Sequence, residues 1–111
     1  MGEFVRVNGT CMVIVVPTEL DHHIAEQIRQ ESERILHVKN IHKIIFDFEK
    51  TGFMDSSGIG MIMGRYKEIR YTGGKVLAIR VNERIRRILT LSGVYKYIEI
   101  YEGLPKQTES F

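Results

Sequence analysis

The sequence predicts an α/β domain with a single mixed β-sheet, formed by an opening β-hairpin and an αβαβαβ continuation, with helices packed against it. Asn8-Gly9 separates two strand-like runs, 3–7 and 10–16, and this dipeptide favours the left-handed dihedrals of a two-residue hairpin turn. Beyond the hairpin, segments with helical apolar spacing alternate with short apolar runs, which is typical of parallel strands joined by helices. A chain of 111 residues has the size of one domain.

The first half of the chain contains a buried strand, a helix and a second strand. Residues 12–16 are apolar at every position, which predicts a strand covered on both faces. Asp21 is the predicted N-cap of the first helix. The apolar side of this helix recurs at helical spacing, at Ile24, Ile28, Ile35 and Leu36. Asn40 marks the loop that follows, and residues 43–48 form the next predicted strand.

The second half repeats this alternation. A second helix is predicted from the spacing of Ile59, Ile62, Met63, Tyr66 and Ile69, and Gly73-Gly74 ends it. Residues 75–79 predict a strand, Asn82 caps a third helix, and residues 97–101 predict a last strand. The core therefore spans about residues 3–101, and we expect the polar stretch 103–111 to be a frayed tail.

Composition and charge exclude several classes of protein. No apolar run is long enough to span a bilayer, and the N-terminus lacks the apolar stretch of a signal peptide. The single cysteine, Cys11, lies in an apolar run and is predicted to be a buried, inert thiol. The 16 basic and 14 acidic residues are interspersed, which argues against nucleic-acid binding. We expect a cytoplasmic protein, monomeric because no long apolar stripe is left over for a dimer.

The most informative segment is Asp55-Ser56-Ser57-Gly58, which joins a predicted strand to a predicted helix. Unpaired backbone N–H groups and the helix dipole make such a position favourable for a phosphate. Ser56 can therefore be a helix cap, a phosphate ligand, a nucleophile or a phosphorylation site. The residues alone favour a structural N-cap over a phosphoacceptor. Glu19, Asp21 and Asp55 are candidates for acidic side chains near Ser56.

Other chemistries fit the sequence less well. A serine hydrolase needs glycines two residues before and two after its nucleophile, and neither Ser56 nor Ser57 has both. The glycines of 58–64 are spaced one residue too widely for a dinucleotide fingerprint, and we expect Gly60 and Gly64 to allow close packing against a neighbour. His22 and His23 are adjacent and do not form a metal-binding pair. No metal or cofactor is expected, although weak anion binding at residues 57–58 stays open.

Three further segments are informative together: Glu19-Leu20-Asp21-His22-His23, Phe53-Met54-Asp55-Ser56-Ser57-Gly58-Ile59-Gly60 and Gly64-Arg65-Tyr66-Lys67. They resemble the STAS domain of anti-sigma factor antagonists. The resemblance runs from about residue 5 to residue 101 and implies one STAS domain over residues 1–111. The chain departs from the family at Pro17-Thr18 and in its short, polar C-terminus, where relatives often continue into an apolar helix.

The resemblance also implies a function and a set of site residues. The unphosphorylated protein would bind an anti-sigma factor that is also an ATP-dependent serine kinase, in its ATP- or ADP-bound form, and so release a sporulation sigma factor. The kinase would phosphorylate Ser56 and a serine phosphatase would reset the switch, with no catalysis by the chain itself. The expected contact residues around the phosphosite are Glu19, Asp21, His22, Asp55, Ser57, Gly58, Gly60 and Arg65. The alternative is a STAS sensor module that binds a small ligand or a nucleotide at the same helix.

Overall fold

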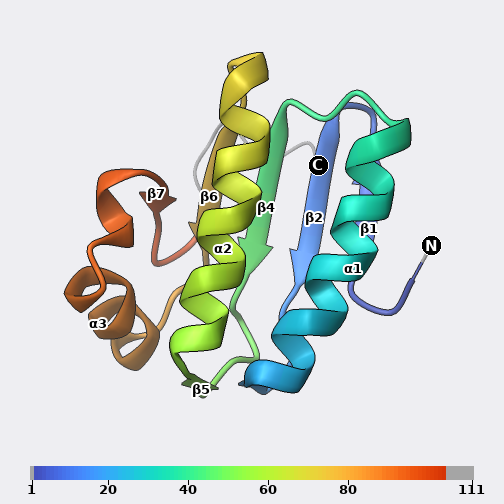
Figure 1. The fold of residues 1–111 in the computed structure, drawn as a ribbon. Helices are drawn as coiled ribbons and strands as arrows, with labels where there is room; N and C mark the ends of the chain where they lie inside the picture. Colours follow the sequence, from blue (N-terminus) through green and yellow to red (C-terminus); the bar gives the residue numbers. More distant parts are fainter. Residues whose placement is uncertain (1, 105–111) are drawn as a thin grey trace.

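The computed structural model describes residues 2–104 and contains the predicted mixed α/β fold (Figure 1). Its main sheet has five strands in the order β1-β2-β4-β6-β7. Their bounds are β1 Val5–Asn8, β2 Cys11–Val15, β4 Lys43–Asp47, β6 Lys75–Ile79 and β7 Glu99–Ile100. β1 is antiparallel to β2, whereas each later neighbour is parallel, as the hairpin and the helical crossovers require.

Two long helices, α1 (His22–Val38) and α2 (Ser56–Ile69), lie side by side across one face of this sheet (Figure 1). The core forms between them and the strands, where Ile28, Ile62 and the β4 residues Ile44 and Phe46 are completely buried. The shorter α3 (Glu83–Leu91) lies toward the β7 side, and single 3₁₀ turns follow α2 (Arg70–Thr72) and α3 (Val94–Lys96). Burial of the α1 and α2 apolar faces holds both helices against the sheet.

A second, two-stranded parallel sheet lies outside the main one and was not predicted. It pairs β3 (Glu19–Leu20) with β5 (Phe53–Met54), in the register Glu19 with Phe53 and Leu20 with Met54. Two-residue strands have no periodicity that a sequence pattern can reveal, and this pairing joins segments 34 positions apart. This pairing brings the starts of α1 and α2 together, because each helix begins two residues after one of these strands.

Most predicted turns and caps are confirmed. Gly9 has a φ of 63° in the hairpin turn, and Gly73, after the 3₁₀ turn, has a φ of 77°. Asp21 Oδ1 accepts a hydrogen bond from the Ile24 N–H at 2.9 Å, and Asn82 Oδ1 accepts one from the Ile85 N–H at 2.9 Å. The last strand is shorter than predicted, because residues 94–96 form a 3₁₀ turn and Tyr97 follows it outside the sheet.

Two further predictions concern Cys11 and the C-terminal tail. Cys11 is half-buried rather than fully buried, and desolvation raises the pKa of its thiol although Lys43 acts in the opposite direction. Its thiol form is therefore favoured, as expected for an inert cysteine. Of the predicted tail, residues 105–111 lie outside the described part of the chain. Within residues 2–104, no helix has both the length and the apolar character that crossing a bilayer requires.

Candidate functional site

The candidate site is built where the first turns of α1 and α2 meet, at the lower end of the view in Figure 1 beside β5. The β3–β5 ladder continues through a hydrogen bond from the Asp55 N–H to the Leu20 carbonyl oxygen at 3.2 Å. Asp21 and Asp55 therefore occupy equivalent positions, and each caps the helix that follows it. The two positive helix ends open onto the same surface.

Ser56 is the first residue of α2 and does not cap it. Asp55 is the N-cap, with extended backbone dihedrals and a side-chain oxygen that accepts the Ser57 N–H at 2.9 Å. The prediction of a structural N-cap at Ser56 is therefore wrong, because the carboxylate of the preceding residue already satisfies this donor. Ser56 is exposed, and within residues 2–104 its hydroxyl has no hydrogen-bond partner. A solvent-facing hydroxyl is thus left at the helix N-terminus.

Ser57 faces the neighbouring helix instead. Its side chain is half-buried, and its Oγ lies 3.4 Å from Nδ1 of His22, the first residue of α1. Both residues line a groove of about 230 Å³ between the two helices. The remaining lining residues are Ala25, Glu26 and Arg29 from α1, and Gly60 and Met61 from α2. The structure therefore brings together His22, Ser57 and Gly60 from the predicted set.

The Ser57–His22 pair has the composition of a nucleophile and its base but lacks the rest of a hydrolase site. The Ser57 N–H is occupied by Asp55 Oδ1, and the Gly58 N–H donates to the Asp55 carbonyl oxygen at 3.1 Å. These are the donors that would otherwise stabilise an oxyanion beside the serine. In the part of the chain that the structure describes, no three His, Cys, Asp or Glu residues are grouped to hold a metal ion.

Gly58 is the glycine that close packing requires. A Cβ at this position would lie 2.7 Å from Met54 Cγ and 2.9 Å from Leu20 Cδ2, so the first turn of α2 rests directly on the β3–β5 ladder. The predicted close packing at Gly60 and Gly64 is wrong, because no atom lies within 4 Å of a Cβ built at either position. Gly58 is thus a buried packing residue and is not part of the exposed surface that carries Ser56.

Arg65 lies apart from the other predicted contact residues. Its side chain is only 3% exposed and is held between the helices by Glu33 of α1 at 3.0 Å and Glu68 of α2 at 2.6 Å. Two of its nitrogens, Nε and Nη1, have no partner within the described residues. In this conformation Arg65 supports helix packing and does not reach the surface around Ser56.

Sequence reasoning missed two charged residues of the groove and one apolar residue beside it. Arg29 binds both Glu26 and Glu33, and its hydrogen bond lowers the pKa of Glu26 to about 2. Phe53 pairs with Glu19 across the small ladder and is 47% exposed next to the phosphosite segment. The available signal was that Leu20-Asp21 and Met54-Asp55 are both apolar–aspartate pairs directly before a helix.

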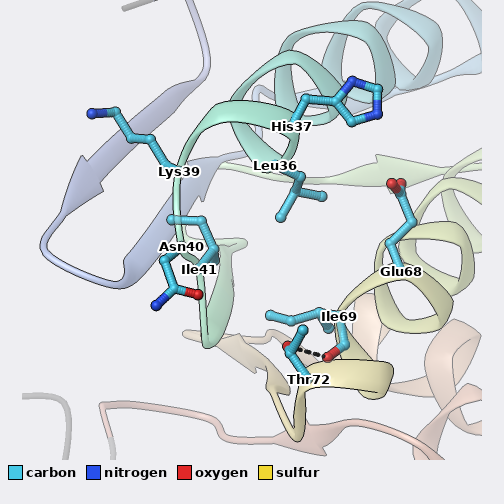
Figure 2. Close-up of a pocket in the computed structure, with 8 residues that line it drawn as sticks. All are labelled: Leu36, His37, Lys39, Asn40, Ile41, Glu68, Ile69 and Thr72. Atoms are coloured by element: carbon cyan, nitrogen blue, oxygen red, sulfur yellow. Dashed lines mark hydrogen bonds between the residues drawn. The ribbon is translucent and has the colours of Figure 1, made fainter.

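A second cavity, of about 190 Å³, lies at the opposite ends of the same helices (Figure 2). Figure 2 shows His37 and Lys39 from the end of α1 above Ile69 and Thr72, where the Thr72 hydroxyl donates to the Ile69 carbonyl oxygen at 2.9 Å. Because it adjoins the C-terminal ends of α1 and α2, this cavity is separate from the site at Ser56.

Comparisons with known proteins agree with this architecture. A family model described as the STAS domain matches residues 5–106. The anti-sigma F factor antagonist of Paenibacillus polymyxa is 34% identical over 92 residues, which cover 83% of this chain and 79% of that protein. The structure of the anti-sigma factor antagonist SpoIIAA in its unphosphorylated form has a TM-score of 0.73 at 28% identity, covering 95% of this chain and 90% of that one.

The phosphorylated form of SpoIIAA, a Bacillus cell fate determinant, has a TM-score of 0.72 at 28% identity and covers 95% of this chain and 92% of that one. The family model covers most of the chain, including both helices that form the candidate site. The chain therefore belongs to the STAS domain family.

Proposed function

We propose that this chain is an anti-sigma factor antagonist that is switched off by phosphorylation of Ser56. Its unphosphorylated form binds an anti-sigma factor with serine kinase activity, in the ATP- or ADP-bound state, and releases a sporulation sigma factor. A serine phosphatase restores the active form, and the chain itself catalyses nothing. The observation that supports this most directly is the exposed, unpaired Ser56 hydroxyl at the start of α2, within residues 2–104. We place the protein in the cytoplasm as a monomer that binds neither nucleic acid nor membrane.

The switch follows from charge at the surface. Phosphorylation adds about −1.5 to −2 charges, and the N-terminal end of α2 stabilises them locally. Glu19, Asp21 and Asp55 lie at the starts of the two helices around Ser56, so the basic groups of a complementary partner are already paired with these carboxylates and none is left for an added phosphate. A phosphate left unpaired in that interface costs several kcal/mol, which is enough to separate the complex. No refolding is required, and the similar TM-scores to unphosphorylated and phosphorylated SpoIIAA, 0.73 and 0.72, support this.

The test is peptide mass spectrometry after incubation of the chain with ATP and the anti-sigma F factor of Paenibacillus polymyxa. We expect one phosphate, on Ser56, in the wild type and in Ser57→Ala, and none on position 56 in Ser56→Ala. The Paenibacillus polymyxa antagonist is the positive control for kinase activity. A chain that stays unmodified while this control is phosphorylated contradicts the proposal.

Binding of the same anti-sigma factor separates the two states of the switch. Ser56→Ala should bind as tightly as the wild type and stay bound in the presence of ATP. Ser56→Asp should bind at least about tenfold more weakly, because one carboxylate reproduces only part of the phosphate charge. Isothermal titration calorimetry measures both constants, and equal affinity of the wild type and Ser56→Asp would refute the charge mechanism.

A second candidate is a small-ligand or nucleotide-binding STAS sensor. The N-terminal end of α2, which opens beside a groove of about 230 Å³ lined by His22 and Ser57, favours it, because a helix N-terminus attracts a phosphate group. Calorimetry with ATP and ADP on the isolated chain distinguishes the two functions. A sensor binds a nucleotide alone, whereas the antagonist shows heat only when the anti-sigma factor is present.

A further inference from the structure

The two adjacent serines of the phosphosite segment differ in what holds their hydroxyl groups. Ser56 is exposed and has no hydrogen-bond partner within residues 2–104, whereas Ser57 Oγ lies 3.4 Å from His22 Nδ1. We propose that His22 is a positioning residue that holds the Ser57 hydroxyl in the α1–α2 groove and thereby directs phosphoryl transfer to Ser56. This inference rests on the proposed function, since it concerns the choice of acceptor by the same kinase.

The backbone around His22 fixes the position of this residue. It is the first residue of α1, whose N-terminus is fixed by the Asp21 cap at 2.9 Å and by the pairing of β3 with β5. The Ser57 backbone is fixed in the same way, because its N–H donates a hydrogen bond to Asp55 Oδ1 at 2.9 Å. The pair therefore joins two rigid helix starts, and releasing the Ser57 hydroxyl requires a change in the His22 side chain or in the helix contact.

The surroundings of Ser57 also disfavour an incoming phosphoryl group. Ser57 shares its groove with Glu26, a carboxylate whose pKa is lowered to about 2 by its hydrogen bond with Arg29 and which therefore stays charged at neutral pH. Arg29, the arginine that lines the groove, is already bound to Glu26 and Glu33. Ser56 is not among the residues that line this groove, so a phosphoryl donor reaches it from the solvent side.

The chemistry of transfer explains why a hydrogen bond to His22 suppresses Ser57 and does not activate it. In the reaction, a serine Oγ forms a bond to the γ-phosphorus of ATP, the bond from that phosphorus to the β–γ bridging oxygen breaks, ADP leaves, and the hydroxyl proton passes to a base on the kinase. Because the transition state is loose, the position of the hydroxyl matters more than its basicity. A hydroxyl held against α1 is poorly placed for in-line attack.

The test measures the ratio of phosphate on Ser57 to phosphate on Ser56, using ATP and the anti-sigma F factor of Paenibacillus polymyxa. Peptide mass spectrometry of His22→Ala should show this ratio raised by about two- to tenfold over the wild type, the effect of losing one hydrogen bond. In the Ser56→Ala background, adding His22→Ala should raise the rate of Ser57 phosphorylation by a similar factor. Both serines share one complex, so a general loss of affinity leaves the ratio unchanged.

Two matched variants act as controls. His22→Asn keeps a polar atom near the position of Nδ1 and should restore the wild-type ratio. His23→Ala removes the neighbouring ring, whose Nε2 pairs with Gln27 at 3.3 Å and not with a serine, and should leave the ratio unchanged. Circular dichroism and urea unfolding of each variant verify that the fold is retained.

The outcomes separate this inference from the proposed function. If the wild type is phosphorylated on Ser56 and the ratio in His22→Ala is equal or lower, the role of His22 is refuted while the switch stands. The same conclusion follows if Ser57 stays unmodified in Ser56→Ala with His22→Ala. If the wild type receives no phosphate while the Paenibacillus polymyxa antagonist does, both proposals fail.

Discussion

At the scale of single residues, capping and chemistry are carried by different side chains of the same turn. Asp55 caps α2, Ser57 contacts His22, and Ser56 makes no hydrogen bond with its side chain within residues 2–104. Mutations of the phosphosite should therefore affect switching without affecting stability. The stability of this turn depends on the neighbouring aspartate.

This separation gives a direct prediction for the cap. Asp55→Ala should lower the free energy of unfolding by about 1 kcal/mol, whereas Asp55→Asn should retain most of it, because asparagine also caps well. Ser56→Ala should change it by less than about 0.5 kcal/mol, as exposed substitutions usually do. Ser57→Ala, which removes the 3.4 Å contact with His22 Nδ1, should change it by no more than about 1 kcal/mol. Urea unfolding followed by circular dichroism measures all four. A cost for Ser56→Ala equal to that of Asp55→Ala would return the capping role to Ser56.

The glycines of α2 give a second prediction at this scale. An alanine Cβ at position 58 meets Met54 Cγ at 2.7 Å and Leu20 Cδ2 at 2.9 Å, so Gly58→Ala should destabilise the fold by about 1–3 kcal/mol. Gly60→Ala meets no atom within 4 Å and should stabilise it by about 0.5–1 kcal/mol, through helix propensity alone. Thermal unfolding compares them, and a shift in the same direction for both would contradict the packing assignment.

At the scale of elements, the sequence is informative where a structure is local and uninformative where it depends on a distant partner. The hairpin at Asn8-Gly9 and the caps at Asp21 and Asn82 are set by neighbouring residues, and all three were predicted correctly. The β3–β5 ladder and the burial of Arg65 depend on contacts across 34 and 32 positions, and both were missed. The candidate site was therefore predicted as residues, but its two-helix geometry was not.

The contact between α1 and α2 leads to a prediction about Arg65. Its Nε and Nη1 are buried without partners among the described residues, while Glu33 and Glu68 are about one-third exposed and can be rehydrated. Arg65→Met should therefore stay within about 1 kcal/mol of the wild type, because an apolar side chain of similar length avoids the cost of a buried charge. Arg65→Ala should lose about 2–4 kcal/mol through the cavity it leaves.

Urea unfolding of the two Arg65 variants decides between packing and charge. If Arg65→Met loses as much stability as Arg65→Ala, the ion pairs with Glu33 and Glu68 stabilise the helix contact and the side-chain volume does not. Binding of the anti-sigma F factor of Paenibacillus polymyxa by folded Arg65→Met should be unchanged, because the residue lies away from the surface around Ser56.

At the scale of the whole molecule, the site lies on the periphery of a rigid framework. The five-stranded sheet contacts α1 and α2 through a continuous core that includes Ile28, Ile44, Phe46 and Ile62. Ser56 is the first residue of α2, lies outside this core and is exposed. A charge added there acts on the first turns of the two helices, which carry the positive ends of the helix dipoles.

Phosphorylation of Ser56 should consequently change the surface and leave the sheet unchanged. Amide NMR shifts between the two forms should be confined to residues 19–24 and 53–61, which contain the ladder, both caps and the first turns of α1 and α2. The amides of β1, β2 and β4 should keep their shifts, because packed interiors respond to a local charge only if a core contact is displaced. Shift changes spread across these strands would mean that the phosphate acts through refolding of the domain, and repulsion at the partner interface would then no longer explain the switch.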